Sequence, residues 1–402
     1  MISNESNSND NFHVDGIQLR IRETNLIVLA IPEKRYNSNS FIDISVDLIN
    51  NTSNPFHLNP KETLITEVLT LDGQAMQGEM APDELVYRGK EDVHSQSSFG
   101  FRLSQFISNL IHWFWKIPKR TFEPQLVNSR QGRTVTLTLK LFWKSNLLQL
   151  QVTNSPSYSP IIFSLLDKSW SFKALQPNTY QLRFLWGIPP SDGEFSSDSE
   201  TTQGISAGQL ATQFVNFALI KPTGADRSAV EVDGIRFETL MPERVLTLPE
   251  KKRGIQTLLQ IGIRITNNTP IPVRFDLFHT LIPQLMGADN QVYLRRYFRR
   301  GTKEPLESDF ISVMPQESTT LFSHASFSWR KHDQFTLTIV AKDGGCWNFN
   351  ALSVGIYQIQ MVYNDKYATQ EIYDQEGLNT NLIENLWTGI VCTPQVEFCL
   401  VR

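Results

Sequence analysis

Residues 42–52 have the sequence Ile-Asp-Ile-Ser-Val-Asp-Leu-Ile-Asn-Asn-Thr, and the fold is predicted outward from them. Up to Leu48 their apolar side chains alternate with Asp and Ser, as expected for a β-strand with one face buried and the other in water. The strand then runs into Asn50-Asn51-Thr52, and a proline follows at position 55, which together indicate a turn. This stretch therefore predicts a sheet that covers a hydrophobic core on one side.

The same pattern recurs in the second half of the chain. Residues 259–265 alternate in the same way and lead into Asn267-Asn268-Thr269, at an offset of 217 residues (267 − 50). Because the order of the matches is constant and their offset changes only in steps, the sequence predicts an internal duplication whose unit is far longer than a solenoid repeat. The other matches pair residues 14–17 with 232–235, residues 32–34 with 249–251, Trp143 with Trp329, and residues 170–181 with 347–358.

The duplication sets the expected domain organisation. The chain has 402 residues and a formal net charge of −4, with 40% hydrophobic and 19% charged residues, which is an ordinary globular composition. Many short alternating segments separated by turn signals are typical of antiparallel β-sandwiches. We therefore expect an all-β protein with two tandem sandwiches. The predicted divisions are a disordered N-terminus (1–11), a first domain (12–221), a linker (222–228) and a second domain (229–402).

One short segment in each copy resembles the tyrosine corner of immunoglobulin-like and fibronectin type III sandwiches. Residues 174–182 and 351–359 each place a turn before a tyrosine, Tyr180 or Tyr357, and the resemblance reaches no particular family. It implies that each tyrosine hydroxyl bonds back to the backbone upstream, so that both residues are structural. Trp170 and Trp347, ten residues before each tyrosine, are expected to anchor the core, with a ligand platform as the alternative.

The first copy contains a segment that the second lacks, at residues 99–119. Its apolar residues follow helical spacing, so the sequence predicts one amphipathic helix that ends at Pro118. Three roles are open for this helix: covering the edge of its own sandwich, binding a partner protein, or lying on a membrane surface. The residues predicted to contact a partner or membrane are Phe106, Leu110, Trp113, Phe114, Trp115 and Lys116.

The second copy is distinguished by residues 291–300, where arginines alternate with aromatic residues. The candidate basic patch consists of Arg295, Arg296, Arg299 and Arg300. Such a pattern can follow a phosphate backbone and stack bases, or bind an acidic protein surface. The alternative is a solvated hairpin whose arginines pair with carboxylates. Because the chain carries net negative charge, nucleic acid is the less favoured partner.

Catalytic signatures are weak in this sequence. Residues 204–208 fit the Gly-x-Ser-x-Gly elbow around Ser206, but an acidic, Ser-rich loop precedes them and a strand-like segment follows, so a serine hydrolase is disfavoured. The histidines and cysteines lack metal-site spacing, and the familiar phosphate-binding glycine motifs are missing. We therefore expect a non-enzymatic protein without cofactor or metal. A carbohydrate-binding or enzymatic site in the loops at the ends of the sandwiches is the alternative.

The remaining expectations concern location and role. Three cysteines cannot all pair, residues 1–11 lack the pattern of a secretory signal, and no apolar run is long enough to span a bilayer. A cytoplasmic protein is predicted, with a peripheral membrane location as the alternative. The expected function is a protein-interaction or scaffolding module that acts through residues 99–119, residues 291–300, or both, with no small-molecule ligand indicated.

Overall fold

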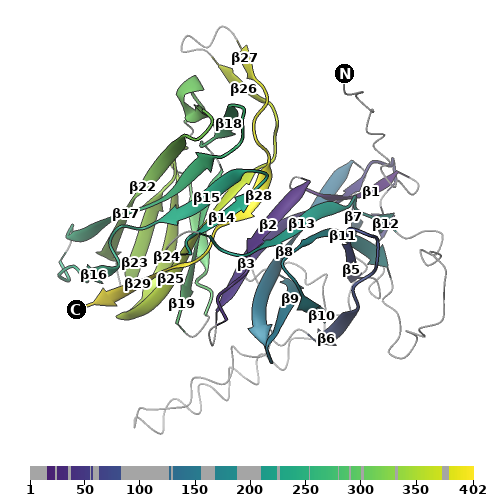
Figure 1. Ribbon diagram of the computed structural model, residues 1–402, viewed down its shortest axis with the longest axis horizontal. Coiled ribbons are helices and arrows are strands. Elements are labelled where there is room, and N and C mark those ends of the chain that lie inside the picture. Colours follow the sequence, from purple (N-terminus) through teal and green to yellow (C-terminus); the bar gives the residue numbers. More distant parts are fainter. Residues whose placement is uncertain are drawn as a thin grey trace.

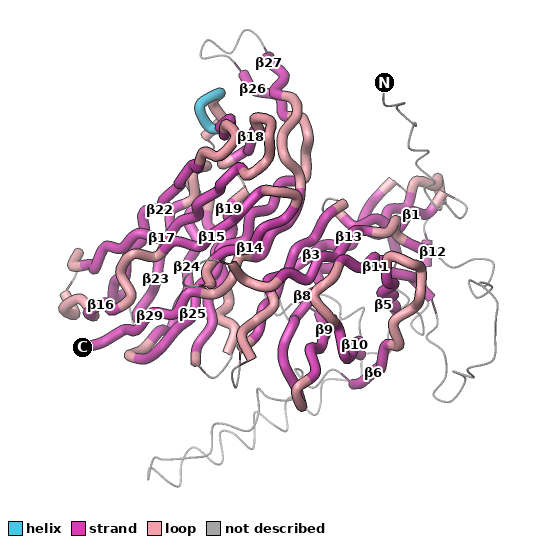
Figure 2. Tube along the Cα trace, in the orientation of Figure 1, coloured by secondary structure: helices cyan, strands magenta, loops and turns pink. Residues whose placement is uncertain are grey.

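The structure is a computed structural model of the chain. Strands make up most of what it describes, and within those residues the one helical element is the short 3₁₀ turn Glu307–Asp309 (Figure 2). The all-β prediction is confirmed. Over the same residues, no helix is long and apolar enough to cross a membrane. The described residues are 16–22, 25–34, 38–54, 56–57, 63–82, 126–127, 130–154, 168–187, 210–223, 227–252, 254–278, 280–288, 291–299, 303–330, 334–373 and 380–402.

The first half contributes a six-stranded antiparallel sheet with the order β1-β3-β8-β9-β10-β6. Ile42, Ile44 and Val46 on β3 are buried in the core, as their alternation predicts. The strands are β1 (Ile17–Ile21), β3 (Asn39–Asn50), β6 (Gly78–Pro82), β8 (Gln131–Lys144), β9 (Leu147–Asn154) and β10 (Lys168–Leu175).

The second half contributes a seven-stranded antiparallel sheet with the order β14-β15-β17-β22-β23-β24-β20. Its longest strands, β17 and β22, pair over most of their length. The strands are β14 (Ala229–Val232), β15 (Ile235–Leu240), β17 (Gln256–Asn267), β20 (Arg295–Phe298), β22 (Ser318–Trp329), β23 (Phe335–Val340) and β24 (Cys346–Leu352).

A ten-stranded sheet runs through both halves and joins them (Figure 1). Its order is β12-β11-β13-β2-β28-β25-β29-β16, with β5 also beside β11 and β19 beside β25. The join is the parallel pair of β2 and β28, from opposite ends of the chain. The strands are β2 (Leu26–Ala30), β5 (Thr63–Thr70), β11 (Thr179–Gly187), β12 (Leu210–Ala211), β13 (Val215–Ile220), β16 (Val245–Thr247), β19 (Leu281–Gly287), β25 (Gly355–Asp365), β28 (Gly389–Cys392) and β29 (Val396–Val401).

Three pairs in the ten-stranded sheet are parallel, namely β13 with β2, β2 with β28, and β16 with β29. The expectation of wholly antiparallel sheets is wrong there. Parallel neighbours need a long connection, which only strands distant in the sequence can have. The remaining small antiparallel pairs join β4 (Phe56–His57) with β7 (Leu126–Val127), β18 (Val273–Asp276) with β21 (Phe310–Val313), and β26 (Gln370–Tyr373) with β27 (Thr380–Ile383).

Two hydrophobic cores fill the spaces between the sheets. The first packs the six-stranded sheet against the first-half strands of the ten-stranded sheet, and includes Phe172 and Phe217. The second packs the seven-stranded sheet against the other part of the ten-stranded sheet, and includes Phe327 and Phe398. Each half is thus a two-layer β structure.

The Asn-Asn-Thr turns make the same contacts in both halves. Asn50 Nδ2 donates to Val127 O at 2.9 Å, and Asn267 Nδ2 donates to Val313 O at 2.9 Å. In both turns the Asn Oδ1 accepts a hydrogen bond from the hydroxyl of the threonine two residues later, at 2.7 and 2.6 Å. The local pattern and its long-range contact therefore recur together.

The two tyrosines also make equivalent contacts. Tyr180 Oη accepts a hydrogen bond from Gln176 N at 2.9 Å and donates to Gln176 O at 3.1 Å. Tyr357 Oη accepts from Ser353 N at 2.9 Å and donates to Ser353 O at 2.8 Å. This is the backbone contact that the resemblance to a tyrosine corner implies.

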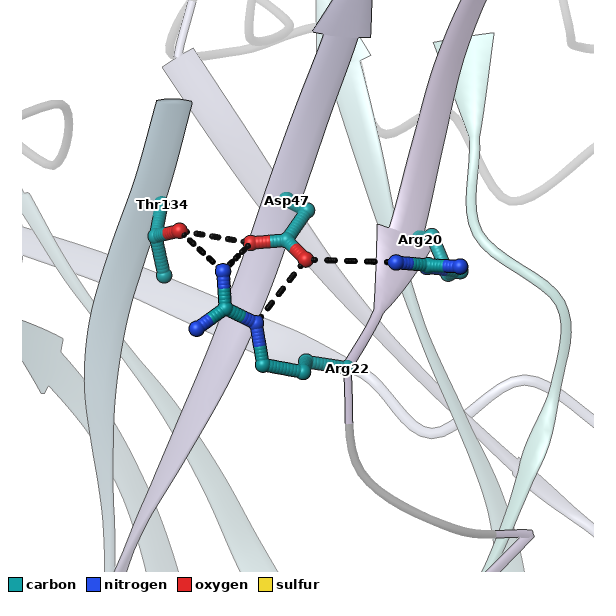
Figure 3. Close-up of polar contacts among 4 residues, drawn as sticks. All are labelled: Arg20, Arg22, Asp47 and Thr134. Carbon is teal, nitrogen blue, oxygen red and sulfur yellow. Dashed lines mark hydrogen bonds and ion pairs between the residues drawn. The ribbon is translucent and has the colours of Figure 1, made fainter. Parts of the chain in front are cut away.

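The outer face of the six-stranded sheet carries a partly buried carboxylate, Asp47 (Figure 3). Arg22 donates to both of its oxygens at 2.8 and 3.0 Å, Thr134 Oγ1 donates at 2.6 Å, and Arg20 lies 3.6 Å away. Burial raises the pKa of Asp47, but the hydrogen bonds from Arg22 and Thr134 and the arginine charges outweigh it and leave the pKa below 3.8.

Candidate functional site

Part of the predicted basic patch lies on β20, at the edge of the seven-stranded sheet. This strand pairs with β24, where Tyr297 lies opposite Trp347. Because side chains alternate along a strand, Arg295 and Tyr297 lie on one face and Arg296 on the other. The described arginines therefore do not form one continuous basic surface, and Arg300 lies outside the described residues.

Arg295 faces the first half of the chain. Its Nη2 atom lies 3.2 Å from Asp43 Oδ2, and the two side chains are only 13% and 6% exposed. Asp43 also accepts a hydrogen bond from Thr138 Oγ1 at 2.6 Å. The Arg295 guanidinium carbon lies 5.6 Å from the centre of the Trp347 ring. Arg295 is therefore a contact between the halves rather than a surface cation.

Tyr297 and Arg299 line a pocket in the second half of the chain. The pocket has a volume of about 330 Å³ and lies between the seven-stranded sheet and strands β19 and β25. Its charged and phenolic lining residues are Tyr297, Arg299, Lys342 and Asp343, and this part of the lining is called the mouth. The walls are mainly apolar and include Leu277, Leu281, Ile282, Leu321, Ile339 and Met361.

Most polar groups at the mouth already have partners. Tyr297 Oη donates to Asp343, which also accepts from Gly345 N at 2.9 Å. A Cβ at Gly345 would collide with the Tyr297 ring, so glycine allows this packing. Burial and the hydrogen bond to Asp343 raise the pKa of Tyr297 above its ordinary value, so its phenol stays protonated. Tyr297 is thus fixed as a donor.

The two cations at the mouth, Lys342 and Arg299, differ in whether they form an ion pair. Lys342 Nζ lies 3.0 Å from Asp309 Oδ1. Arg299, by contrast, makes no ion pair within the described part of the chain and is exposed. The mouth therefore keeps one cation whose charge is not neutralised by a direct contact.

Trp347 also lines the pocket, and its buried ring N–H has no hydrogen-bond partner in the part of the chain that the structure describes. Its equivalent in the first half, Trp170, donates its N–H to Leu64 O at 3.2 Å. The Trp347 ring packs on Tyr297, with 4.5 Å between ring centres. A buried donor left unpaired costs about 1–3 kcal/mol. An acceptor on a bound molecule would remove that cost.

The other predicted site residues can be placed as follows. Trp170, Tyr180 and Tyr357 are buried. The residues Phe106, Leu110, Trp113, Phe114, Trp115, Lys116 and Ser206, together with the whole predicted helix, lie outside the described residues. The role of residues 99–119 therefore stays a prediction.

Reactive groups are few among the described residues. Cys346, Cys392 and Cys399 are free, and burial raises the pKa of the Cys392 thiol well above its ordinary value. Within the same residues, no three His, Cys, Asp or Glu side chains gather as metal ligands do. No protein-family model matches the sequence, and no curated protein is detectably similar to it. Function is therefore inferred from the pocket itself.

Proposed function

We propose that the chain is a non-enzymatic binding module whose second sandwich holds a small amphipathic anion. The observation that carries this proposal is the largely apolar pocket, whose lining includes Trp347 and Arg299. Among the described residues, the buried ring N–H of Trp347 has no hydrogen-bond partner and Arg299 has no ion pair. The predicted partner-protein role of residues 99–119 is a separate route of interaction beside it.

Shape and charge favour this ligand class. A volume of about 330 Å³ lies at the lower end of the range for small-molecule pockets, which are mostly apolar with a few placed polar groups. An alkyl or aromatic body would cover the apolar walls, and a carboxylate would pair with Arg299. Arginine binds carboxylates well because its donors match both oxygens.

The polar groups at the mouth are suited to binding rather than to proton transfer. Tyr297 is held protonated, and Asp343 accepts hydrogen bonds from both Tyr297 and Gly345. A general base needs a pKa near the working pH and a free lone pair directed at the substrate. This pair therefore serves to orient the Tyr297 ring against Trp347.

We further propose that the two halves are immunoglobulin-like units derived from one duplicated sandwich. The equivalent contacts of Asn50 and Asn267, and of Tyr180 and Tyr357, support this origin. Duplication also explains why a difference between equivalent residues is informative. Trp170 and Trp347 share a position, but only the Trp347 N–H lacks a partner.

Isothermal titration calorimetry with octanoate, and with 1-octanol as the uncharged control, tests the pocket. We expect the chain to bind octanoate more tightly than 1-octanol. Arg299→Ala is expected to weaken octanoate binding about tenfold or more and to leave 1-octanol unchanged, since a hydrogen bond to a charged group contributes about 1.5–3 kcal/mol. Trp347→Phe is expected to weaken both ligands, because either oxygen can accept its N–H.

Arg296→Ala is the matched control, because Arg296 is exposed on the opposite face of β20. It should leave both affinities unchanged. Failure of octanoate to bind the intact chain would refute the proposal. So would octanoate binding that survives both Arg299→Ala and Trp347→Phe, provided that thermal melting shows the variants to be folded.

A further inference from the structure

A second cavity lies at the junction of the two halves, where it is lined by residues of β2 and β3 from the first half and of β25 and β29 from the second. Its volume is about 610 Å³. Asn39, the first residue of β3, lines it from one side, and Gln358 and Val396 line it from the other. It shares no lining residue with the pocket around Trp347.

Asn39 is 1% exposed, and within the described residues neither its amide nitrogen nor its amide oxygen has a hydrogen-bond partner. Other residues on the same face of β3 are paired with the second half: Phe41 O accepts from Gln360 Nε2 at 3.1 Å, and Asp43 pairs with Arg295. Two unpaired polar atoms on one buried side chain are unusual in a folded protein. The Asn39 amide is thus buried and unpaired, whereas its neighbours on β3 have partners.

The equivalent position in the second half is Gln256, at the same offset of 217 (256 − 39), and it is exposed. Burial of an unpaired amide is therefore a property of the junction and not of the repeated fold. In Asn39 the donor and the acceptor lie side by side on one amide. A residue of an extended peptide matches both at once, because its backbone N–H and C=O point to the same side of the chain.

The charges around the cavity are balanced. Its charged lining residues are two arginines and two glutamates. Arg227 Nη1 lies 3.5 Å from Glu33 Oε1, and Arg244 Nη1 donates to the backbone carbonyl of Glu397 at 3.2 Å. Cations and carboxylates thus occur together, which gives no net attraction for a polyanion. Pro32, Pro222 and Pro394 add rigid apolar surface without backbone N–H groups. These surroundings suit a neutral, extended chain better than a phosphate-bearing ligand.

We propose that this cavity is a second binding site, and that it takes an extended peptide segment of a partner protein. The backbone N–H and C=O of one residue of that segment, which point to the same side of an extended chain, form a reciprocal pair of hydrogen bonds with the Asn39 side chain. Apolar side chains of the segment rest on the prolines and Val396. The site goes beyond the anion pocket and does not depend on it.

A library of random synthetic decapeptides, presented to the intact chain, tests this proposal. Enriched peptides are resynthesised, and each backbone amide is replaced in turn by an ester, which removes one N–H. We expect peptides that bind Asn39→Leu at least tenfold more weakly than the intact chain. In such a peptide, the ester at one particular position should weaken binding to the intact chain. The same ester should not weaken binding to Asn39→Leu any further.

Stability measurements keep the test decisive. Asn39→Leu should keep or raise the midpoint of thermal unfolding, because it removes an unpaired buried amide. Asn39→Asp keeps the size of the side chain and loses the N–H donor, and it should cause the same loss of peptide binding. It replaces Asn39→Leu in the test if the leucine variant does not fold. Gln256→Leu, at the equivalent position of the second half, should leave peptide binding unchanged. Arg299→Ala should also leave it unchanged, so a negative result for the anion pocket can be told apart from a negative result for this site.

Two results would overturn the proposal. One is the absence of any enriched peptide. The other is enrichment of peptides that bind Asn39→Leu and Asn39→Asp as tightly as the intact chain. A lowered melting temperature in both variants together with unchanged peptide binding would assign the amide a structural role, with water as its partner.

Discussion

Asp365, at the end of β25, is a buried carboxylate with another carboxylate, Asp276, nearby. Burial raises the pKa of Asp365 to about 7; Asp276 adds to the rise, and hydrogen bonds from Tyr367 N and Tyr363 Oη oppose it. Asp47 on the outer face of the six-stranded sheet shows the opposite shift, because its arginine partners outweigh its burial. Stability contributed by Asp47 is therefore present above the unfolded pKa of about 3.9 and is lost as the pH falls through the lower folded value.

For Asp365 the sign is reversed. The folded pKa of Asp365 lies above the unfolded value of about 3.9. The stability that Asp365 contributes is therefore fully present below about pH 3.9 and is lost as the pH rises through about 7. We predict that Asp365→Asn stays neutral and avoids this loss. Its free energy of unfolding, measured by urea denaturation from pH 4 to pH 8, should therefore rise progressively relative to the parent chain.

Glu371→Gln on the neighbouring strand β26 is the control, because Glu371 is exposed. It should leave the pH dependence of stability as it is. If Asp365→Asn shows the same difference from the parent chain at every pH, the carboxyl group does not titrate in this range.

Trp347 shows the limit of sequence reasoning for a single residue. Its alignment with Trp170 predicts the same structural role for both, and both do pack against their cores. What distinguishes them is the acceptor of the ring N–H. Leu64, which supplies that acceptor for Trp170, lies 106 residues away in the chain. No local pattern reports such a partner, so the candidate site could not be predicted from the tryptophans.

At the scale of single elements, the sequence predicts the Asn-Asn-Thr segments as turns, but it does not predict that they hydrogen-bond to another strand. Asn267 is fully buried and donates to Ile271 O at 2.7 Å and to Val313 O at 2.9 Å. The second acceptor belongs to β21, which the turn thereby ties to the end of β17. The sequence pattern around residue 267 contains no information on that strand, because it follows much later in the chain.

We predict that Asn267→Ala lowers the free energy of unfolding by about 2–3 kcal/mol, because it leaves the buried Val313 carbonyl and the turn without partners. Asn268→Ala, one residue further on and exposed, should change it by less than about 0.5 kcal/mol. Chemical denaturation of the two variants gives the comparison. Equal losses of stability in the two variants would show that the buried hydrogen bonds of Asn267 contribute no more than the exposed side chain of Asn268.

At the scale of the whole molecule, two features join the halves. The ten-stranded sheet passes from β2 to β28. The outer face of β3 is contacted by the second half through Phe41 and Asp43. The alternation around residue 43 correctly places these side chains away from the first core. It could not show that a second sandwich covers them, because the contacts of Asp43 and Arg295 span 252 residues.

The Asp43–Arg295 pair decides how strongly this junction contributes to stability. Both side chains are mostly buried, so removing one leaves the other charge without its partner, at a cost of about 3–5 kcal/mol. We predict losses of that size for Asp43→Leu and for Arg295→Met singly. In the double variant most of the loss should be recovered, since an apolar pair of similar volume removes both charges together.

Urea denaturation of the four proteins in this double-mutant cycle measures the coupling free energy between Asp43 and Arg295. Arg296→Ala is the control for the loss of an arginine, because Arg296 is exposed on the opposite face of β20. Strict additivity of the two single changes would mean that the pair is not formed in solution. A coupling of several kcal/mol, with one cooperative transition for the whole chain, is the expected result. It follows because the buried pair and the continuous sheet link the same two cores, so that opening the junction separates Asp43 from Arg295 and β2 from β28.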